Sequence, residues 1–529
     1  MEGTGVNPFG NPDGSRAAIE EILDGFVNFG NEAVWGGLAM SSDDRTVRVI
    51  VGRKGSGKTV YLRRLQAYAT REPSLYADDI QQSLPQTESI VKFCQQFPPE
   101  ILTEKWIELW RCAFLSSVVT HMLFHRELRD KVTAETAEAL KRDYASILPA
   151  TYKTPVSAYS QVTRIIDSNR TYNAINAHLS HDSWNQVEWL VGEELNRLPP
   201  LCFYIDAVDE DFENAPMYWL RCQLGLFYAT MRMLRDTRLG NRLHIAICIR
   251  DIVLAAVLRS EHKTRYVRES HIRILKWNVP AIGHFLTQKI LSLPTEYFMG
   301  NVQTKGKTLT TWLGKDVIRN TPRKIDEPVQ QYLLRHTRLI PRDVITMGNA
   351  LCEAIAQYKY FGGKDWSEIV RKVVHENARV FGDEQLEICS KQISSDTMPS
   401  GAGRHRFSET YTGGSEYQQG VSGDMKQLIA GIGKDRFSRR ELDAGRKIAA
   451  EIFGAECDPF AALWQNGLLG YVTKVGKSER QIFFTEDRMD EFQVPTDKDQ
   501  YVFHSCVIDS TGIKSVGKQP VIVASAVGE

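Results

Sequence analysis

The sequence has little that suits a secreted or membrane-spanning protein, and its cysteines do not suit a disulfide framework or a zinc site. Its nine cysteines are scattered, several of them lie in apolar runs, and no C-x-x-C pair occurs. This pattern argues against a disulfide framework or a zinc site, and it predicts buried thiols in a reducing cytoplasm. The opening residues, MEGTGVNPFGNPDGS, are polar and rich in turn formers, so we expect no signal peptide.

A long hydrophobic run and a net charge are also missing. The longest apolar run, residues 112–124, contains serine, threonine and histidine, and it is too short and too polar to predict a membrane span. The 65 basic and 65 acidic residues cancel, which excludes a global attraction to nucleic acid or to an anionic membrane and leaves local patches possible. A chain of 529 residues without repeats predicts two or three domains.

The most informative segment is residues 47–65, VRVIVGRKGSGKTVYLRRL. A β-branched run is followed by GRKGSGKT, which fits the Walker A pattern G-x-x-x-x-G-K-[ST] at every fixed position, and then by an apolar helical pattern. Strand, glycine-rich loop and helix form the context in which this pattern predicts phosphate binding. The alternative is a glycine-rich turn without a ligand.

The chemistry of this loop assigns a role to each residue. Glycines at 52, 55 and 57 allow backbone conformations that a Cβ excludes, so the loop amides can form a nest for phosphate oxygens beside a helix N-terminus. The predicted catalytic Lys58 reaches the β- and γ-phosphates of ATP, and the Thr59 hydroxyl binds Mg²⁺. The predicted nucleotide-binding residues are Gly52, Arg53, Lys54, Gly55, Ser56, Gly57, Lys58 and Thr59.

A second segment, LCFYIDAVDE at 201–210, predicts the residues of the same site that bind the metal ion and activate the water. Five apolar residues suit a strand buried on both faces of a parallel sheet, and Asp206 follows at its carboxyl end, where a Walker B aspartate would hold Mg²⁺. Asp209 or Glu210 is then the predicted general base that polarises the attacking water, and we favour Glu210. The alternative is that these acids only solvate a loop and cap the next helix.

Two arginines are candidate sensors of the γ-phosphate. Arg250 follows a further buried strand, LHIAICI at 243–249, and its alternative role is a structural salt bridge. Arg342 begins a helix after LIP, and the alternative for it is an Arg342–Asp343 feature of the surface.

The periodicity of the remaining chain predicts an α/β fold. It is a P-loop NTPase parallel sheet with a helical insertion and a helical lid, followed by a small C-terminal winged-helix (α+β) domain. Residues 308–318 are expected to be helical in the lid, and the polar residues 154–176 to be irregular. The expected parts are a disordered tail at 1–15, a core at 16–280 with its insertion at about 85–195, a lid at 281–390, a flexible linker at 391–424, and the winged helix with its tail at 425–529.

The order helix, helix, helix, strand, turn, strand in residues 425–488 predicts the winged helix. The presumed recognition helix, DPFAALWQN at 458–466, has no lysine or arginine, whereas a major-groove reader normally carries basic and amide side chains. We therefore favour a protein partner for this domain over DNA.

Together these segments resemble the bacterial P-loop ATPases related to the STAND and KAP NTPases. The resemblance rests on IVGRKGSGKT, FYIDAVDE, ICIRDIV with HIRILKW, and LIPRDVITMGNAL, and it covers roughly residues 20–380 and, more loosely, 425–510. It implies an ATP-driven switch, often of bacterial defence or stress systems, with an oligomeric active state. The spacing of about 148 residues between Lys58 and Asp206 departs from compact AAA+ proteins and requires the helical insertion.

Three functions remain to be compared. The first is a cytoplasmic ATPase switch that uses ATP and Mg²⁺ and that controls homo-oligomerisation or a partner effector protein. The second is a DNA-binding ATPase, which would need a basic surface on the winged helix. The third is a scaffold in which bound ATP is structural.

Overall fold

The computed structural model describes most of the chain, and the described residues form two compact units. The described residues are 7–24, 26, 46–81, 87–148, 152–206, 216–363, 365–396, 414–455, 457–475, 478–484 and 493–516. Residues 37–51 and 58–274 form the unit that we call the sheet unit. Residues 1–36, 52–57 and 275–529 form the other, which we call the helical unit.

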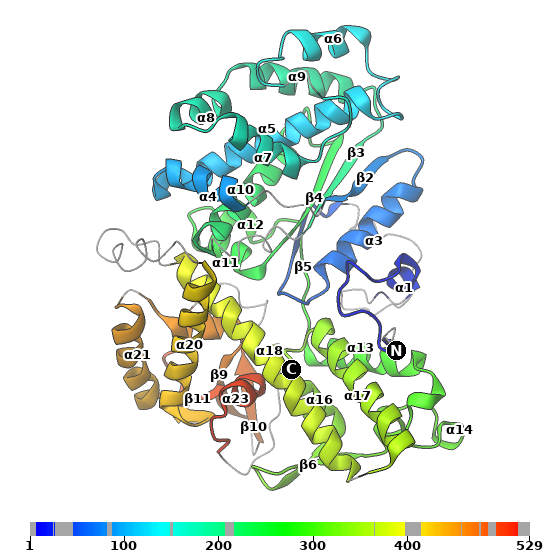
Figure 1. Ribbon diagram of the computed structural model, residues 1–529, viewed down its shortest axis with the longest axis vertical. Coiled ribbons are helices and arrows are strands. Elements are labelled where there is room, and N and C mark those ends of the chain that lie inside the picture. Colours follow the sequence, from blue (N-terminus) through cyan, green and yellow to red (C-terminus); the bar gives the residue numbers. More distant parts are fainter. Residues whose placement is uncertain are drawn as a thin grey trace. The chain divides into compact units, whose positions relative to one another are not determined.

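A five-stranded parallel sheet is the centre of the sheet unit (Figure 1). Its strands lie in the order β2-β3-β4-β1-β5 and span Tyr76–Gln81, Leu201–Ile205, Leu243–Ile249, Val49–Val51 and Ile272–Ile274. β4 pairs with β3 on one side, with Leu201 opposite Leu243, and with β1 on the other, with Val49 opposite Ile247. The apolar runs at 201–205 and 243–249 are therefore central strands, as their lack of polar alternation predicted.

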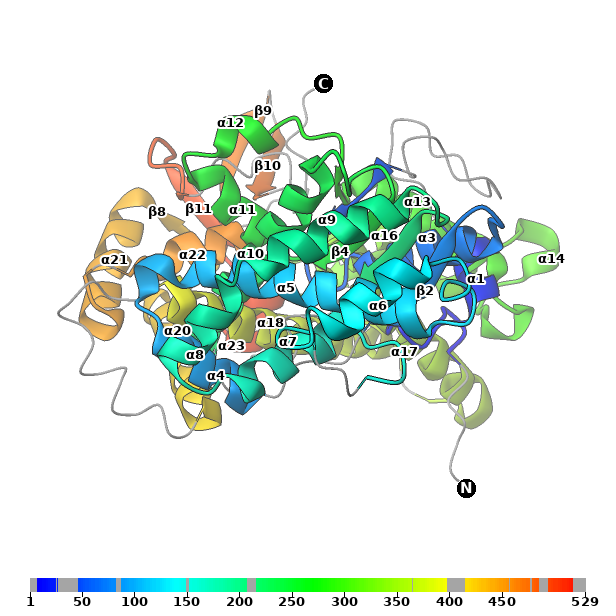
Figure 2. The same ribbon diagram turned by 90° about the horizontal axis from the view of Figure 1, so that it is seen from above.

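Helices cover the sheet on both sides (Figure 1). α3 packs on β1 to β4, and α10 packs on β4 and on the long helix α5. α4, α7 and α8 lie beside α5 in both views (Figures 1 and 2), which confirms a mostly helical region between β2 and β3. The helices span Lys58–Arg71 (α3), Thr87–Gln96 (α4), Pro99–Phe124 (α5), Ala134–Arg142 (α6), Ala158–Ser168 (α7), Tyr172–Leu179 (α8), Ser183–Leu195 (α9), Pro216–Arg235 (α10), Asp251–Arg259 (α11) and Lys263–Tyr266 (α12).

The long helix α5 is an internal core element. Among the described residues it is the one helix long and apolar enough to cross a membrane, but 78% of that apolar segment is buried inside the protein. Trp106, Trp110 and Leu115 are fully buried in it. Because the core helix of a soluble protein has the same length and composition, α5 is weak evidence for a membrane.

The prediction that residues 154–176 are irregular is wrong. Ser157 and Thr171 accept hydrogen bonds from backbone amides at the starts of α7 and α8, which satisfies helix N-termini that the polar composition obscured. Val162, Ile165 and Ile166 form a buried face of α7, and that face packs on α5. Burial of this narrow apolar face against α5 stabilises the helix.

The helical unit begins with α1 (Ile19–Asp24) and continues from Leu275 through a series of helices. The predicted helix at 308–318 is only partly present, because α15 ends at Leu313 and Gly314 takes a left-handed conformation with φ of 65°. A hairpin of β6 and β7 follows. The elements are α13 (Val279–Ser292), a 3₁₀ turn (Thr295–Tyr297), α14 (Val302–Lys305), α15 (Leu309–Leu313), β6 (Val317–Asn320), β7 (Ile325–Pro328), α16 (Val329–Arg335), α17 (Pro341–Phe361) and α18 (Trp366–Asp396).

The described C-terminal part of this unit has four helices and a small antiparallel sheet in the order β10-β9-β11-β8. The predicted helices and hairpin are present, and the strands β8 and β11 were not expected. The elements are α20 (Gly414–Ile432), β8 (Arg436–Ser438), α21 (Arg439–Phe453), α22 (Pro459–Gln465), β9 (Leu469–Val475), β10 (Ser478–Phe483), β11 (Gln500–Phe503) and α23 (Ser505–Thr511).

Two predicted unstructured segments are shorter than expected. The flexible linker at 391–424 is helical where it is described, because α18 continues to Asp396 and α20 begins at Gly414, and residues 397–413 lie outside the described part. The prediction of a disordered tail at 1–15 is also wrong for residues 7–15. Phe9 is 1% exposed and packs against Trp312, and its amide donates to Asn349 Oδ1 at 2.8 Å. One aromatic side chain thus anchors a turn-rich segment.

Candidate functional site

The glycine-rich loop at 52–57 has the backbone conformation that its glycines predicted. Gly55 and Gly57 have φ of 86° and 94°, in the left-handed region that favours glycine. The φ of Gly52 is outside that region, but a Cβ at this position would collide with the Ser56 side chain. Two glycines are therefore needed for backbone torsion and one for close approach.

The helical unit holds this loop from several directions. The Arg342 amide donates to Gly55 O at 3.3 Å, and the Trp277 indole donates to Ser56 O at 2.9 Å. A Cβ on Gly55 would lie only 2.9 Å from both Arg342 Cβ and Ile340 Cδ1. Ser56 itself is fully buried, and its hydroxyl has no hydrogen-bond partner among the described residues. A buried donor of this kind is uncommon in a folded protein and is consistent with a ligand oxygen at the loop.

A carboxylate on α18 is surrounded by cations from the loop and from α17. Glu384 Oε1 lies 3.1 Å from Lys54 Nζ and 3.4 Å from Arg342 Nη1, while Oε2 lies 3.1 Å from Arg338 Nη2. Burial alone would raise the pKa of Glu384, but Arg338, Lys54 and Arg342 outweigh it and lower the pKa to about 2. Two of the predicted nucleotide-binding cations, Lys54 and Arg342, therefore share one anionic partner.

Asp343 is not part of a surface feature with Arg342, which corrects that alternative. Asp343 is completely buried and forms a two-pronged ion pair with Arg338, with contacts of 2.6 and 2.8 Å. The Arg338 backbone amide also donates a hydrogen bond to Asp343 Oδ2, at 2.9 Å. This ion pair fixes the start of α17. The neighbouring residue, Arg342, contacts Glu384 and the loop.

Arg53 points toward the C-terminal part of the helical unit. Its Nη2 donates to Phe484 O at 2.8 Å, and its guanidinium lies 5.9 Å from the centre of the Phe484 ring. A Cβ on Gly467 would lie 2.9 Å from Arg53 Nη1, so a glycine is needed there too. The loop thus contacts both α17 and the module that follows α20.

In the sheet unit, the predicted residues lie at the carboxyl ends of parallel strands. Lys58 and Thr59 are the first two residues of α3, which follows β1 and the loop, so the N-terminal dipole of that helix lies at their position. Asp206 follows β3 directly and is 2% exposed. Arg250 follows β4, the strand between β1 and β3, and is 8% exposed. Because β3 pairs with β4, Asp206 and Arg250 follow neighbouring strands.

Neighbouring side chains hold these strand ends. The Tyr159 hydroxyl, on α7, donates to Asp206 O at 2.9 Å, and the Asp206 amide donates to Gln81 O at 3.2 Å. The Gln223 side chain on α10 accepts from the Arg250 amide at 3.5 Å. The two predicted general bases, Asp209 and Glu210, lie outside the described residues.

Three residues of this arrangement were missed by sequence reasoning: Glu384, Arg338 and Tyr159. Glu384 is one acid in the polar run GDEQLE on a long helix, and nothing in its local pattern separates it from its neighbours. Only the packing of α18 near the loop distinguishes it. Tyr159 belongs to the segment wrongly predicted to be irregular, so its contact with Asp206 could not be anticipated.

The presumed recognition helix is not available to DNA in this arrangement. Six of the seven residues of α22 are buried, including Phe460, Leu463 and Trp464. α22 packs on α18 and on β9, and Gln385 on α18 donates to Asn466 at its end. A helix that enters the major groove must present a polar face to solvent, and α22 does not.

Searches against protein-family models, curated proteins and solved structures found no match to this chain.

Proposed function

We propose that this protein is an ATP-binding and ATP-hydrolysing molecular switch in which residues 52–59 bind the nucleotide phosphates. The observation that carries the proposal is the loop itself. Left-handed torsions at Gly55 and Gly57 lie between a buried strand and a helix N-terminus, and two cations of the phosphate-binding set share a single carboxylate. Backbone amides of this kind favour anions, and lysine and arginine complete the site.

The order of the sheet supports the same proposal. β4 lies between β1, which leads into the loop, and β3, which ends at Asp206. One strand thus lies between the predicted Walker A and Walker B strands, which is compatible with the P-loop ATPase resemblance. Arg250 therefore follows the strand that lies between β1 and β3. Ligands of open parallel sheets bind at the carboxyl ends of the strands.

The proposed reaction is in-line attack of water on the γ-phosphorus of ATP. The water oxygen forms a bond to phosphorus, the bond to the β,γ-bridging oxygen breaks, and the products are ADP and phosphate. Glu210 or Asp209 accepts the proton of the water, and Lys58 neutralises charge on the β- and γ-phosphates. Thr59 and Asp206 would hold Mg²⁺, which offsets phosphate charge in such sites. Turnover is expected to be slow, because a switch needs a long-lived bound state.

Glu384 gives the proposed switch a physical basis. A γ-phosphate and the Glu384 carboxylate would compete for Lys54 and Arg342, since both are anions that accept from the same donors. Phosphate contact would therefore weaken the hold of α18 on the loop, and differential contacts of this kind shift a conformational equilibrium. We propose that the released surface binds a second copy of the chain or an effector protein, in a cytoplasmic defence or stress pathway as the resemblance implies.

A DNA-binding ATPase is a weaker proposal. Burial of α22 removes the surface that such a module would place in the major groove. We therefore prefer a protein partner for the C-terminal module, which in the proposed function keeps its winged-helix interpretation.

The test of ATP binding and hydrolysis is a comparison of Lys58→Ala with Lys372→Ala. Lys372 is an exposed lysine on α18 whose contact to Glu376 is 3.8 Å, so its loss controls for the removal of one charge. We expect Lys58→Ala to lower ATP affinity roughly 10- to 100-fold, as loss of a charge-assisted contact does, and to abolish turnover. Equal binding and turnover in the two variants would contradict the assignment.

The switch itself is tested by sizing the protein with ADP and then with a non-hydrolysable ATP analogue. A larger particle with the ATP analogue supports nucleotide-controlled assembly. If the protein binds ATP and Lys58→Ala is inactive, but the particle has the same mass with ADP and with the analogue, self-assembly is contradicted. Effector binding would then be the output of the switch. Nucleotide binding without turnover would support the scaffold function instead.

A further inference from the structure

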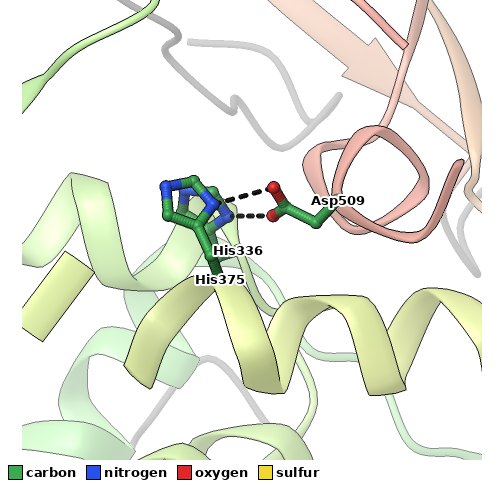
Figure 3. A group of neighbouring side chains, drawn as sticks. All are labelled: His336, His375 and Asp509. Carbon is green, nitrogen blue, oxygen red and sulfur yellow. Dashed lines mark hydrogen bonds and ion pairs between the residues drawn. The ribbon is translucent and has the colours of Figure 1, made fainter. Parts of the chain in front are cut away.

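Two histidines and one aspartate from three separate elements meet in the helical unit (Figure 3). His336 follows α16 as its C-cap, His375 lies on α18 and Asp509 lies on α23. Their ligand atoms all lie within 4.8 Å of one another. Figure 3 shows both imidazole rings facing the same carboxylate.

The contacts place one imidazole on each carboxylate oxygen. His336 Nδ1 lies 2.9 Å from Asp509 Oδ2, and His375 Nδ1 lies 2.7 Å from Oδ1. The side chain of His336 is 2% exposed and that of Asp509 is 13% exposed, whereas that of His375 is 39% exposed. The group is thus closed on the His336 side and open to solvent beside His375.

We propose that His336, His375 and Asp509 form a binding site for Zn²⁺, which ties α16, α18 and α23 together. Imidazole nitrogen and carboxylate oxygen are ligands of zinc, whereas magnesium and calcium prefer oxygen alone. Three protein ligands leave a fourth position for water, and the exposed edge of His375 is the side from which the ion and the water would enter.

The outer contacts of the histidines suit this role. His375 Nε2 lies 3.1 Å from the Tyr332 hydroxyl, so the ring can donate its other proton there once Nδ1 holds the metal. His336 Nδ1 donates to Asp509 before a metal binds, and its buried Nε2, which has no hydrogen-bond partner among the described residues, takes the ring proton when Nδ1 becomes the ligand. In both rings the proton moves from Nδ1 to Nε2, and no net proton is lost.

Metal binding requires a small expansion of the group. Ligand atoms about 2.1 Å from a tetrahedral zinc are roughly 3.4 Å apart, so each N–O separation must grow by about half an ångström. Asp509 lies on the seven-residue helix α23, and among the described residues the hydrogen bonds of its side chain are those to the two histidines. A movement of this size lies within the ordinary range of side-chain adjustment.

The test uses the full-length protein, stripped of metal by a chelator and then titrated with Zn²⁺ and Co²⁺. We expect one tight ion per chain and, with Co²⁺, the intense visible absorption of a four-coordinate nitrogen and oxygen site. His375→Ala and Asp509→Asn should lose this ion and this spectrum. His262→Ala removes an exposed histidine of the sheet unit that lies outside this group and pairs with Glu261, and it should keep both.

Tyr332→Phe supplies a graded test that does not remove a ligand. Loss of an outer-shell partner lowers metal affinity on the order of 10- to 100-fold, so this variant should bind Zn²⁺ more weakly but still at one ion per chain. The Co²⁺ spectrum of the wild-type protein tests the site even if a variant fails to fold. Weak octahedral absorption in the wild type, or equal Zn²⁺ affinity in wild type and Asp509→Asn, would overturn the proposal.

Discussion

Replacement of Glu384 by glutamine removes the charge that links α18 to the loop at 52–57 while it keeps the shape of the side chain. Glu384 contacts Lys54, Arg342 and Arg338 at 3.1, 3.4 and 3.1 Å. Arg338 keeps Asp343 as a partner after the change, so the variant mainly releases Lys54 and Arg342. We therefore expect a local loss of stability at the loop and at the start of α17, without global unfolding.

The magnitude follows from the pKa of Glu384. Its fall from 4.5 to about 2 corresponds to about 3 kcal/mol of folding free energy. The side chain is 26% exposed, so solvent screens part of this, and we expect a loss of about 1–3 kcal/mol at pH 7. Because the folded pKa is lower than the unfolded one, this stabilisation is present above about pH 4.5 and disappears as the pH falls toward 2.

Amide hydrogen exchange measures this loss locally. A change of 1–3 kcal/mol in the opening free energy lowers protection of peptides that cover residues 52–57 and the start of α17 by roughly 5- to 150-fold. Glu376→Gln is the matched control, since Glu376 lies on the same helix, is 57% exposed and pairs with Lys372 at 3.8 Å. Such a surface pair contributes at most about 0.5 kcal/mol. Equal protection in Glu384→Gln and Glu376→Gln would refute the reasoning.

Three further changes have definite expectations. Gly55→Ala forces a Cβ into a left-handed torsion against Arg342, so urea denaturation should show a loss of about 1–3 kcal/mol, whereas Gly423→Ala, with open space at its Cβ, should lose none. Arg323→Ala leaves the buried Asp435 carboxylate without its partner at 2.5 Å, and its unfolding free energy should fall by about 3–5 kcal/mol. Phe9→Ala empties a fully buried site, and it should cost about 3–5 kcal/mol and expose the N-terminal segment to proteolysis.

Much of the sheet unit could be predicted from the sequence because its signals are local. Residues 201–205 are an uninterrupted apolar run, residues 243–249 are a mostly apolar one, and each is a strand with the predicted bounds. The glycine spacing of the loop likewise fixes torsions that only glycine adopts freely, and Gly55 and Gly57 have them. The α/β class and the parallel sheet were therefore predictable, although the order of its strands was not.

The failed predictions have a common cause, which is that a few distant contacts outweigh local composition. Residues 158–168 look polar and loop-like, yet three apolar side chains on one face make them a helix against α5. The segment around Phe9 resembles a free tail, yet one ring buried against Trp312 fixes it. In both cases the apolar area is small, and only its burial by a partner far along the chain stabilises the structure.

The sequence by itself determined the glycine-rich pattern at 52–59, the acid at 206 and the strands that precede them, because strand, turn and helix signals act over a few residues. Only the tertiary structure decided what surrounds them. Glu384 pairs with Lys54, and Asp509 pairs with two histidines, and in each of these pairs the partners are more than a hundred positions apart. Charges and ligands meet where helices pack, and no local pattern encodes which helix faces will meet.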